Sequence, residues 1–154
     1  MENSPLIVQT IETEPPTQDI SAFGMDGDDL LSILSMFDPY GVWKIDLDSG
    51  QMYWSRDVFK IHGIEYHEGP VDLQASIKRY HPEDQKTIGA LLSEAIEREV
   101  GFRYVLRLNT KDSSYKLVKA ICKHRTNGQG TKQLVGVLSE FALPMRSIAT
   151  IDDA

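Results

Sequence analysis

The chain has 154 residues, of which 41% are hydrophobic and 25% are charged, and its formal charge is −7. This composition is typical of one globular domain that buries its own core, and the acidity disfavours nucleic-acid binding, which needs clustered lysine and arginine. No apolar run has the length of a membrane-spanning helix, the N-terminus has no signal-peptide pattern, and the single Cys122 forms no internal disulfide. We therefore expect a cytoplasmic protein without membrane or nucleic-acid contacts.

Residues 1–27 differ from the rest of the chain because they combine prolines, acidic residues and hydroxyl residues with no apolar periodicity. This pattern predicts a flexible N-terminal arm. Four apolar residues within the arm are candidates for a short docked strand: Leu6, Ile7, Val8 and Ile11. Residues 144–154, which begin at a proline, are expected to form a tail. The starting Met1 and the long arm favour a complete small protein over a fragment whose output domain lies beyond Ala154.

A short helix is predicted for residues 28–37. Asp28 and Asp29 are favourable at its start, where backbone amides are unpaired and the helix dipole is positive, and Pro39 follows its end. Its apolar residues recur at helical spacing: Leu30, Leu31, Ile33, Leu34 and Phe37. The next segment alternates in the manner of a strand, turns at residues 48–50 and alternates again, which predicts a hairpin.

Helices and strands fill the remainder of the domain in a regular order. Short helices are predicted after Ser55 and over residues 71–80, and a longer helix begins at Pro82 and stops at Gly101. Three alternating segments then predict strands: residues 102–109, 115–124 and 133–143. The order predicts an α+β fold over residues 28–143. In it a five-stranded antiparallel sheet carries helices on one face, with the helix of residues 28–37 as a flanking element.

Several local strings are similar to those of the PAS family. The hairpin matches the pattern G-x-W-x-x-D-x-x-x-G-x-x-x-W-S through Gly41, Trp43, Asp46, Gly50, Trp54 and Ser55. Residues 80–85, which read Y-H-P-E-D-Q, resemble the H-P-E-D string that opens the family's long helix. Residues 102–108 and 134–141 resemble the strand after that helix and the closing strand. With four strings in the family's order, the chain resembles a single-domain PAS protein with the PAS fold.

The resemblance implies a sensory or interaction module, of the kind that controls a sensor kinase in bacterial-type two-component signalling. Relatives that bind haem use a histidine on the long helix, and this helix has none. Relatives that bind flavin for light sensing use a cysteine in the string N-C-R-F-L-Q, which the chain lacks. The chain also has no metal-ligand spacing, nucleophile motif or phosphate-binding loop. We therefore expect no cofactor, no metal, no catalytic residue and no enzyme activity.

The predicted sheet has apolar residues on both faces, whereas helices on one side can cover only one of them. Soluble proteins seldom leave a large apolar face open. The flanking helix, a second copy of the chain, or a helix exchanged between two copies would cover it. The interface candidates come from this helix and the last two strands: Leu30, Leu31, Ile33, Leu34, Phe37, Leu117, Ile121, Leu134 and Leu138. The leading hypothesis is a homodimer that also contacts a kinase-type signalling partner.

The alternative hypothesis is a small-molecule receptor, because the resemblance places a ligand pocket between the sheet and the helices. The candidates for its lining are aromatic and aliphatic residues: Trp54, Phe59, Ile61, Ile77, Tyr80, Phe102 and Tyr104. Because both faces of the predicted sheet are apolar, we rank the second sheet face ahead of this pocket as the expected binding site. A haem or flavin sensor ranks last, since the residues that would hold either group are missing.

Overall fold

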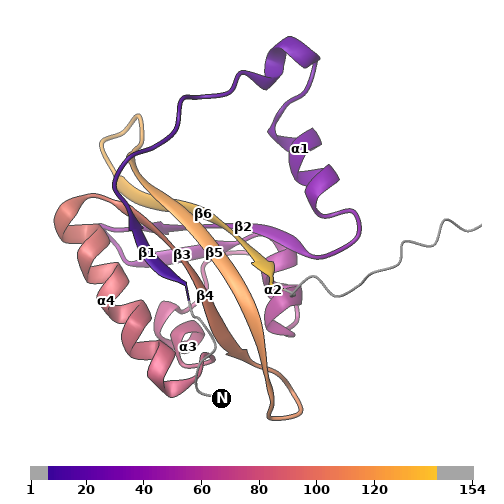
Figure 1. Cartoon of the computed structure of the whole chain (residues 1–154), viewed down its shortest axis with the longest axis vertical. Helices are drawn as coiled ribbons and strands as arrows, with labels where there is room; N and C mark the ends of the chain where they lie inside the picture. The colour runs from indigo at the N-terminus through magenta and orange to yellow at the C-terminus, as the bar shows by residue number, and fades with distance from the viewer. Residues whose placement is uncertain (1–6, 142–154) are drawn as a thin grey trace, which may run out of the picture.

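Six antiparallel strands form one sheet in the computed structural model, which describes residues 7–141 (Figure 1). In sheet order they are β1 (Val8–Ile11), β4 (Gly101–Asn109), β5 (Tyr115–Thr126), β6 (Lys132–Glu140), β2 (Tyr40–Asp46) and β3 (Gln51–Trp54). The predicted α+β fold and antiparallel sheet are confirmed. The sheet has one strand more than the five predicted, because β1 from the N-terminal arm pairs with β4, with Val8 opposite Tyr104.

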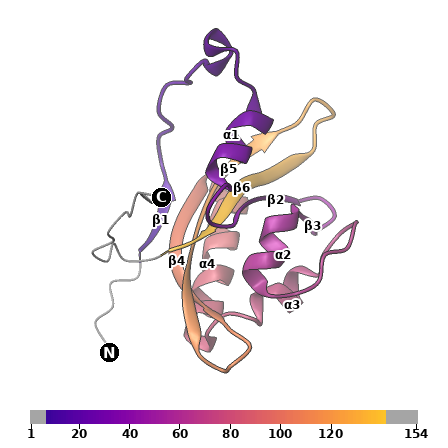
Figure 2. The same cartoon turned by 90° about the vertical axis from the view of Figure 1, so that its right-hand side faces the viewer.

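Three helices lie on one face of the sheet (Figure 2). They are α2 (Arg56–His62), α3 (Leu73–Ile77) and α4 (Pro82–Arg98). Alternate side chains of the strands point toward these helices and form the core. Its buried members include Val58, Ile61, Ile88, Leu91, Phe102, Leu106, Leu108, Val118 and Leu134. None of the described helices has the length and apolar character needed to cross a membrane.

The glycine and serine of the hairpin motif bring α2 against β2. A Cβ atom on Gly41 would lie 2.5 Å from Cγ2 of Val58 and 2.8 Å from its backbone nitrogen, so a larger residue would push α2 away. Ser55 closes this contact, because its Oγ accepts a hydrogen bond from the Val42 amide at 2.9 Å. The Ser55 amide in turn donates to the Val42 carbonyl at 2.9 Å. The motif therefore fixes where α2 begins.

The H-P-E-D string joins the start of α4 to β4. Nδ1 of His81 accepts a hydrogen bond from the Glu83 amide at 3.1 Å, and Pro82 occupies the first turn. The Asp84 carboxylate is 1% exposed and accepts three hydrogen bonds from Arg107, from its amide at 2.8 Å, Nε at 3.0 Å and Nη2 at 2.7 Å. Burial opposes ionisation of Asp84, but the hydrogen bonds from Arg107 together outweigh it and lower the pKa of the carboxyl.

Helix α1 (Gly27–Leu34) stands off the sheet, preceded by the short helix η1 (Ile20–Phe23) (Figures 1 and 2). It starts one residue before the predicted position because Asp26 is its N-cap. The Asp26 carboxylate accepts a hydrogen bond from the Asp29 amide at 2.9 Å, and the Asp29 carboxylate accepts one from the Asp26 amide at 3.1 Å. It ends earlier than predicted, where Oγ of Ser35 donates to the carbonyl one turn back at 2.8 Å.

Candidate functional site

A small cavity lies in the core, where α2, α3 and α4 meet the sheet. Its volume is about 50 Å³. Trp54, at the end of β3, stacks on the imidazole of His62, with ring centroids 4.2 Å apart. The Tyr80 ring lies edge-on to His62, and the hydroxyl groups of Tyr80 and Tyr104 are 2.7 Å apart and share a hydrogen bond. The cavity wall therefore combines apolar surface with an imidazole and a pair of phenols.

His62 presents a buried nitrogen that lacks a partner. Its Nδ1 lies 2.9 Å from the carbonyl oxygen of Val58, so Nδ1 carries the hydrogen and donates it. Nε2 is then an acceptor, and it is buried without a hydrogen-bond partner among residues 7–141. Burial lowers the pKa of His62 to about 4, so the ring is neutral at neutral pH. A bound molecule with a hydrogen-bond donor would satisfy this nitrogen.

The two tyrosines complement the imidazole. Burial raises the pKa of Tyr80 to about 12 and raises the pKa of Tyr104 well above its usual value, so both phenols keep their hydrogens. One hydroxyl donates to the other, which leaves one O–H available to a bound molecule. The cavity thus offers an acceptor in His62 and a donor in the tyrosine pair.

The size of the cavity limits what it can hold. Pockets for drug-sized ligands have volumes of roughly 300–1,000 Å³, several times that of this cavity. A volume of about 50 Å³ accommodates water or a ligand of a few heavy atoms. Within the described part of the chain, no three His, Cys, Asp or Glu side chains gather in a way that would hold a metal ion.

The second face of the sheet carries apolar side chains between basic ones. The register places Val42 opposite Val137 and Lys44 opposite Val135, and Ile121 of β5 lies on the other side of Val137. These five residues share one face because side chains at paired positions point the same way. Helices α2, α3 and α4 lie on the opposite face, so none of these helices covers this one within residues 7–141.

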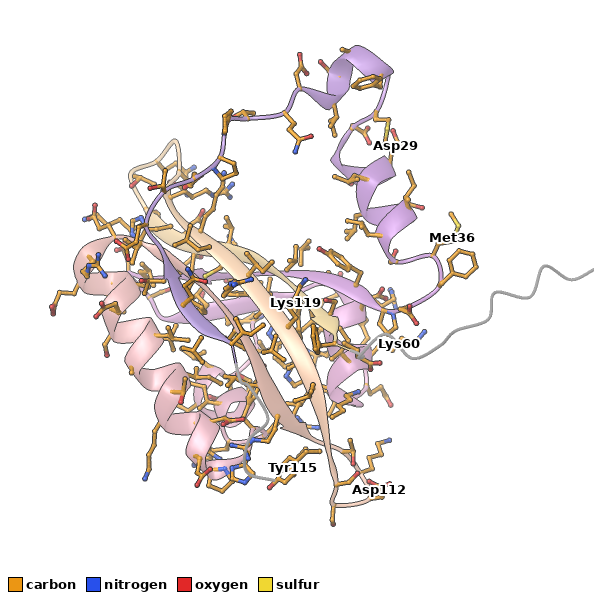
Figure 3. The ribbon with its side chains drawn as sticks, viewed as in Figure 1. Asp29, Met36, Lys60, Asp112, Tyr115 and Lys119 are labelled. Carbon is orange, nitrogen blue, oxygen red and sulfur yellow. The ribbon has the colours of Figure 1, made fainter. Side chains whose placement is uncertain are left out.

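A groove of about 890 Å³ runs over this face. Its floor is formed by residues of β2, β3, β5 and β6, and residues 14–17 of the N-terminal arm bound one side of it. Lys44, Lys123 and Arg125 also line the groove together with Glu14, so the groove is apolar with a rim in which basic side chains outnumber the acidic one. Figure 3 shows Lys119 on the same face, in the middle of β5.

Solved structures share this arrangement of sheet and helices. A sensory box histidine kinase/response regulator from Burkholderia thailandensis E264 matches with a TM-score of 0.56 and 23% identity, over 75% of this chain and 84% of that one. The N-terminal domain of a diguanylate cyclase with a PAS/PAC sensor, from Marinobacter aquaeolei, matches with a TM-score of 0.57 and 18% identity, over 66% and 94%. An RNA-binding light-oxygen-voltage receptor matches with a TM-score of 0.59 and 13% identity, over 70% and 32%.

The chain has the PAS fold. No protein-family model matches the sequence, and no curated protein matches it either. At identities of 23% and below, the structural likeness establishes the fold alone. What this PAS-fold chain binds has to be argued from its own residues.

Five of the seven predicted pocket residues line the cavity of this PAS fold. They are Trp54, Ile77, Tyr80, Phe102 and Tyr104. Phe59 and Ile61 are buried but lie outside the lining, and Phe59 instead packs edge-on against Trp54. The period of the α-helix explains the difference, because Val58 and His62 are one turn apart on α2 and face the cavity together, with the intervening residues turned aside.

The predicted interface residues of the sheet do not all lie on the second face. Leu117 and Ile121 do, but Leu134 and Leu138 are only 0% and 3% exposed and point into the core. The prediction for these two leucines is wrong for a geometric reason. Since Ile121 pairs with Val137, the odd-numbered residues of β6 share its face and the even-numbered ones face the helices.

The predicted interface residues of the helix remain exposed in the single chain. Leu30, Ile33 and Leu34 on α1 are exposed, and Leu31 is half-buried. Phe37, which follows α1, is 92% exposed. Helix α1 therefore does not cover the second face of the sheet within one chain. Both apolar surfaces are left without a partner in the described part of the chain.

Sequence reasoning missed His62, the most polar group in the cavity wall. A signal for it was present, since Val58 and His62 stand one helical turn apart in the segment that follows Trp54 and Ser55. The role of His62 depends on its stacking against Trp54, a contact between two elements that helical spacing alone does not reveal.

Proposed function

We propose that this PAS-fold chain is a cytoplasmic signalling module that acts by binding proteins and performs no catalytic step of its own. It forms a homodimer through the second sheet face and α1, and it contacts a signalling partner of the sensor-kinase type. The observation that carries the proposal is the presence of two uncovered apolar surfaces on one chain, the groove over β2, β5 and β6 and the exposed side of α1. Large apolar surfaces of this kind mark interaction sites.

The two surfaces are complementary in charge as well as in polarity. The start of α1 carries Asp28 and Asp29, whereas the groove carries Lys44, Lys123 and Arg125 against one carboxylate, that of Glu14, which lies 3.9 Å from Lys123. Opposite charges at the rim of an apolar contact set its orientation. Since each copy has both surfaces, one two-fold axis can place α1 of each copy in the groove of the other.

The class of the partner is proposed from the fold. Two of the similar structures are described as a sensory box histidine kinase/response regulator and a diguanylate cyclase with a PAS/PAC sensor. Those domains share a chain with a signalling enzyme. We propose that the present module reaches a kinase-type enzyme by contact.

The homodimer is tested by Val137→Glu. Val137 lies in the floor of the groove and is half-buried, so the isolated chain can keep its fold while the dimer would bury an unpaired carboxylate. Because such a group costs several kcal/mol, we expect the dissociation constant to rise about 100-fold or more. Sedimentation equilibrium over a concentration series measures it.

The matched control is Ile96→Glu, which places the same charge on an exposed aliphatic residue of α4, on the opposite side of the sheet. This variant is expected to dimerise as the original chain does. An original chain that stays monomeric at high micromolar concentration, or equal dissociation constants for the two variants, would contradict the dimer. Circular dichroism checks that both variants remain folded.

A second candidate function is reception of a small polar molecule in the internal cavity. The unpartnered Nε2 of His62, beside the Tyr80–Tyr104 hydroxyl pair, favours it. Native mass spectrometry is expected to show a low-mass adduct that His62→Phe removes, because phenylalanine has no acceptor and fills part of the space. If the wild-type chain and His62→Phe each show only the mass of their own polypeptide, with no adduct, the receptor function is contradicted.

A further inference from the structure

A third concave surface lies where the end of α3 meets the hairpin between β4 and β5. The hollow has a volume of about 550 Å³. Its lining residues are Lys78, Arg79, Asn109, Thr110, Lys111, Ser113 and Tyr115. Tyr115 and the hairpin residue Asp112 mark the region in Figure 3. Among residues 7–141 the lining contains three cationic side chains and no carboxylate, in a chain whose formal charge is −7.

The three cations are not neutralised by the described part of the chain. No carboxylate of residues 7–141 forms an ion pair with Lys78, Arg79 or Lys111. Asp112 is close in sequence, but its carboxylate accepts hydrogen bonds from the hydroxyl groups of Thr110 and Ser114. That carboxylate forms no ion pair with the two lysines or Arg79, and even counted against them it leaves the described lining with a net positive charge.

Arg79 is fixed in position at this site. Its Nη2 donates to the His62 carbonyl at 2.6 Å, and its own carbonyl accepts a hydrogen bond from the Asn109 amide at 2.8 Å. Its Nε is buried and has no partner among the described residues. An ordered guanidinium is suited to oxygen atoms arranged as in phosphate, because its planar fork matches their geometry.

We propose that this hollow binds a phosphoryl group. A phosphate close to doubly charged can engage Arg79 and both lysines, and its oxygens can accept hydrogen bonds from their N–H groups and from the Ser113 hydroxyl. A carboxylate carries a single charge and would leave most of the positive charge unmatched. The phosphoryl group comes either from a phosphorylated side chain of a protein or from a small phosphorylated molecule, which present the same oxygens.

The hollow is also connected to the internal cavity. The carbonyl that Arg79 holds belongs to His62, whose ring forms part of the cavity wall.

A nitrogen–proton NMR titration tests the site with three probes: inorganic phosphate, a phosphoserine peptide and the same peptide without phosphate. Ionic strength is held constant with chloride. We expect phosphate and the phosphoserine peptide to shift the amides of residues 110–113 in a saturable way, and the unmodified peptide to leave them in place. Tighter binding of the phosphoserine peptide assigns the source to a modified side chain, and equal or weaker binding assigns it to a small molecule.

The decisive variant is Lys78→Glu with Lys111→Glu, which reverses two of the three charges on exposed residues. We expect phosphate to bind this variant at least about tenfold more weakly. Lys60→Glu with Lys86→Glu changes the net charge equally outside the lining and should bind as the original chain does. Equal weakening in both variants, no saturable shift, or equal shifts from the unmodified peptide would overturn the proposal. Val137→Glu should leave phosphate binding intact, which separates this site from the dimer.

Discussion

Asp84→Ala is expected to destabilise the fold by about 2–4 kcal/mol, because it removes the buried carboxylate of an ion pair and leaves the half-buried Arg107 with only the exposed Glu83 as a carboxylate partner. Arg107 would lose the oxygens that its amide, Nε and Nη2 now reach at 2.7–3.0 Å. Urea unfolding followed by circular dichroism measures the change in the free energy of unfolding. The contact joins the start of α4 to β4, so its loss separates a helix from the sheet that it covers.

Glu83→Ala is the matched control for this prediction. Glu83 precedes Asp84 on the same turn and reaches Nη2 of Arg107 at 3.4 Å, but its side chain is 77% exposed. An exposed pair contributes little, so we expect a change within about 0.5 kcal/mol. Equal losses from the two variants would show that burial of Asp84 does not matter. The lowered pKa of Asp84 also predicts a pH dependence. The stability that its carboxylate contributes is present above the pKa of the unfolded chain and is lost as the pH falls through the pKa of the folded chain.

A second large effect is expected from His62 as the pH falls. Burial lowers its pKa from 6.5 to about 4, with the hydrogen bond to Val58 opposing the shift. Between these values the unfolded chain binds a proton that the folded chain does not, so stability rises with pH across this window and is lost on acidification. We expect the wild-type chain to lose about 3 kcal/mol more than His62→Gln between neutral pH and pH 4.

The measurement is the free energy of unfolding in urea at a series of pH values. The difference between the wild-type chain and His62→Gln isolates the imidazole, because the carboxyl groups that titrate near the same pH are common to both. His67→Gln, which removes an exposed imidazole, is the matched control. Parallel curves of unfolding free energy against pH for the wild-type chain and His62→Gln would mean that His62 binds its proton equally well in the folded and the unfolded chain, and would contradict the prediction.

The order of elements was predictable from the sequence because each element has its own local signal. The alternation of residues 102–109, the proline at the start of α4 and the glycine-rich turns act within a few residues, and the structure has strands and helices at these places. The string H-P-E-D located α4 correctly. Its acidic residues were explained by the helix dipole alone, which missed the contact between Asp84 and Arg107.

The faces of the last two strands were not predictable in the same way. Alternation shows which residues of one strand share a face, but both faces of β5 and β6 are apolar, so hydrophobicity does not say which face is inside. The answer depends on the register, Ile121 opposite Val137, which is set by the hairpin between them. The same reason explains why Leu134 and Leu138 were assigned to the surface although they are buried.

The two strands at the ends of the sheet, β1 and β3, have a consequence for how copies of the chain can associate. Each has four residues. An unpaired edge offers backbone amides and carbonyls on which a strand of another molecule can add, and short edges are one way in which proteins prevent this. These short edges therefore disfavour a continuous sheet that extends from copy to copy, as in fibrils. In the proposed dimer, copies associate through the flat of the sheet, where two chains close on each other and leave no such surface for a third.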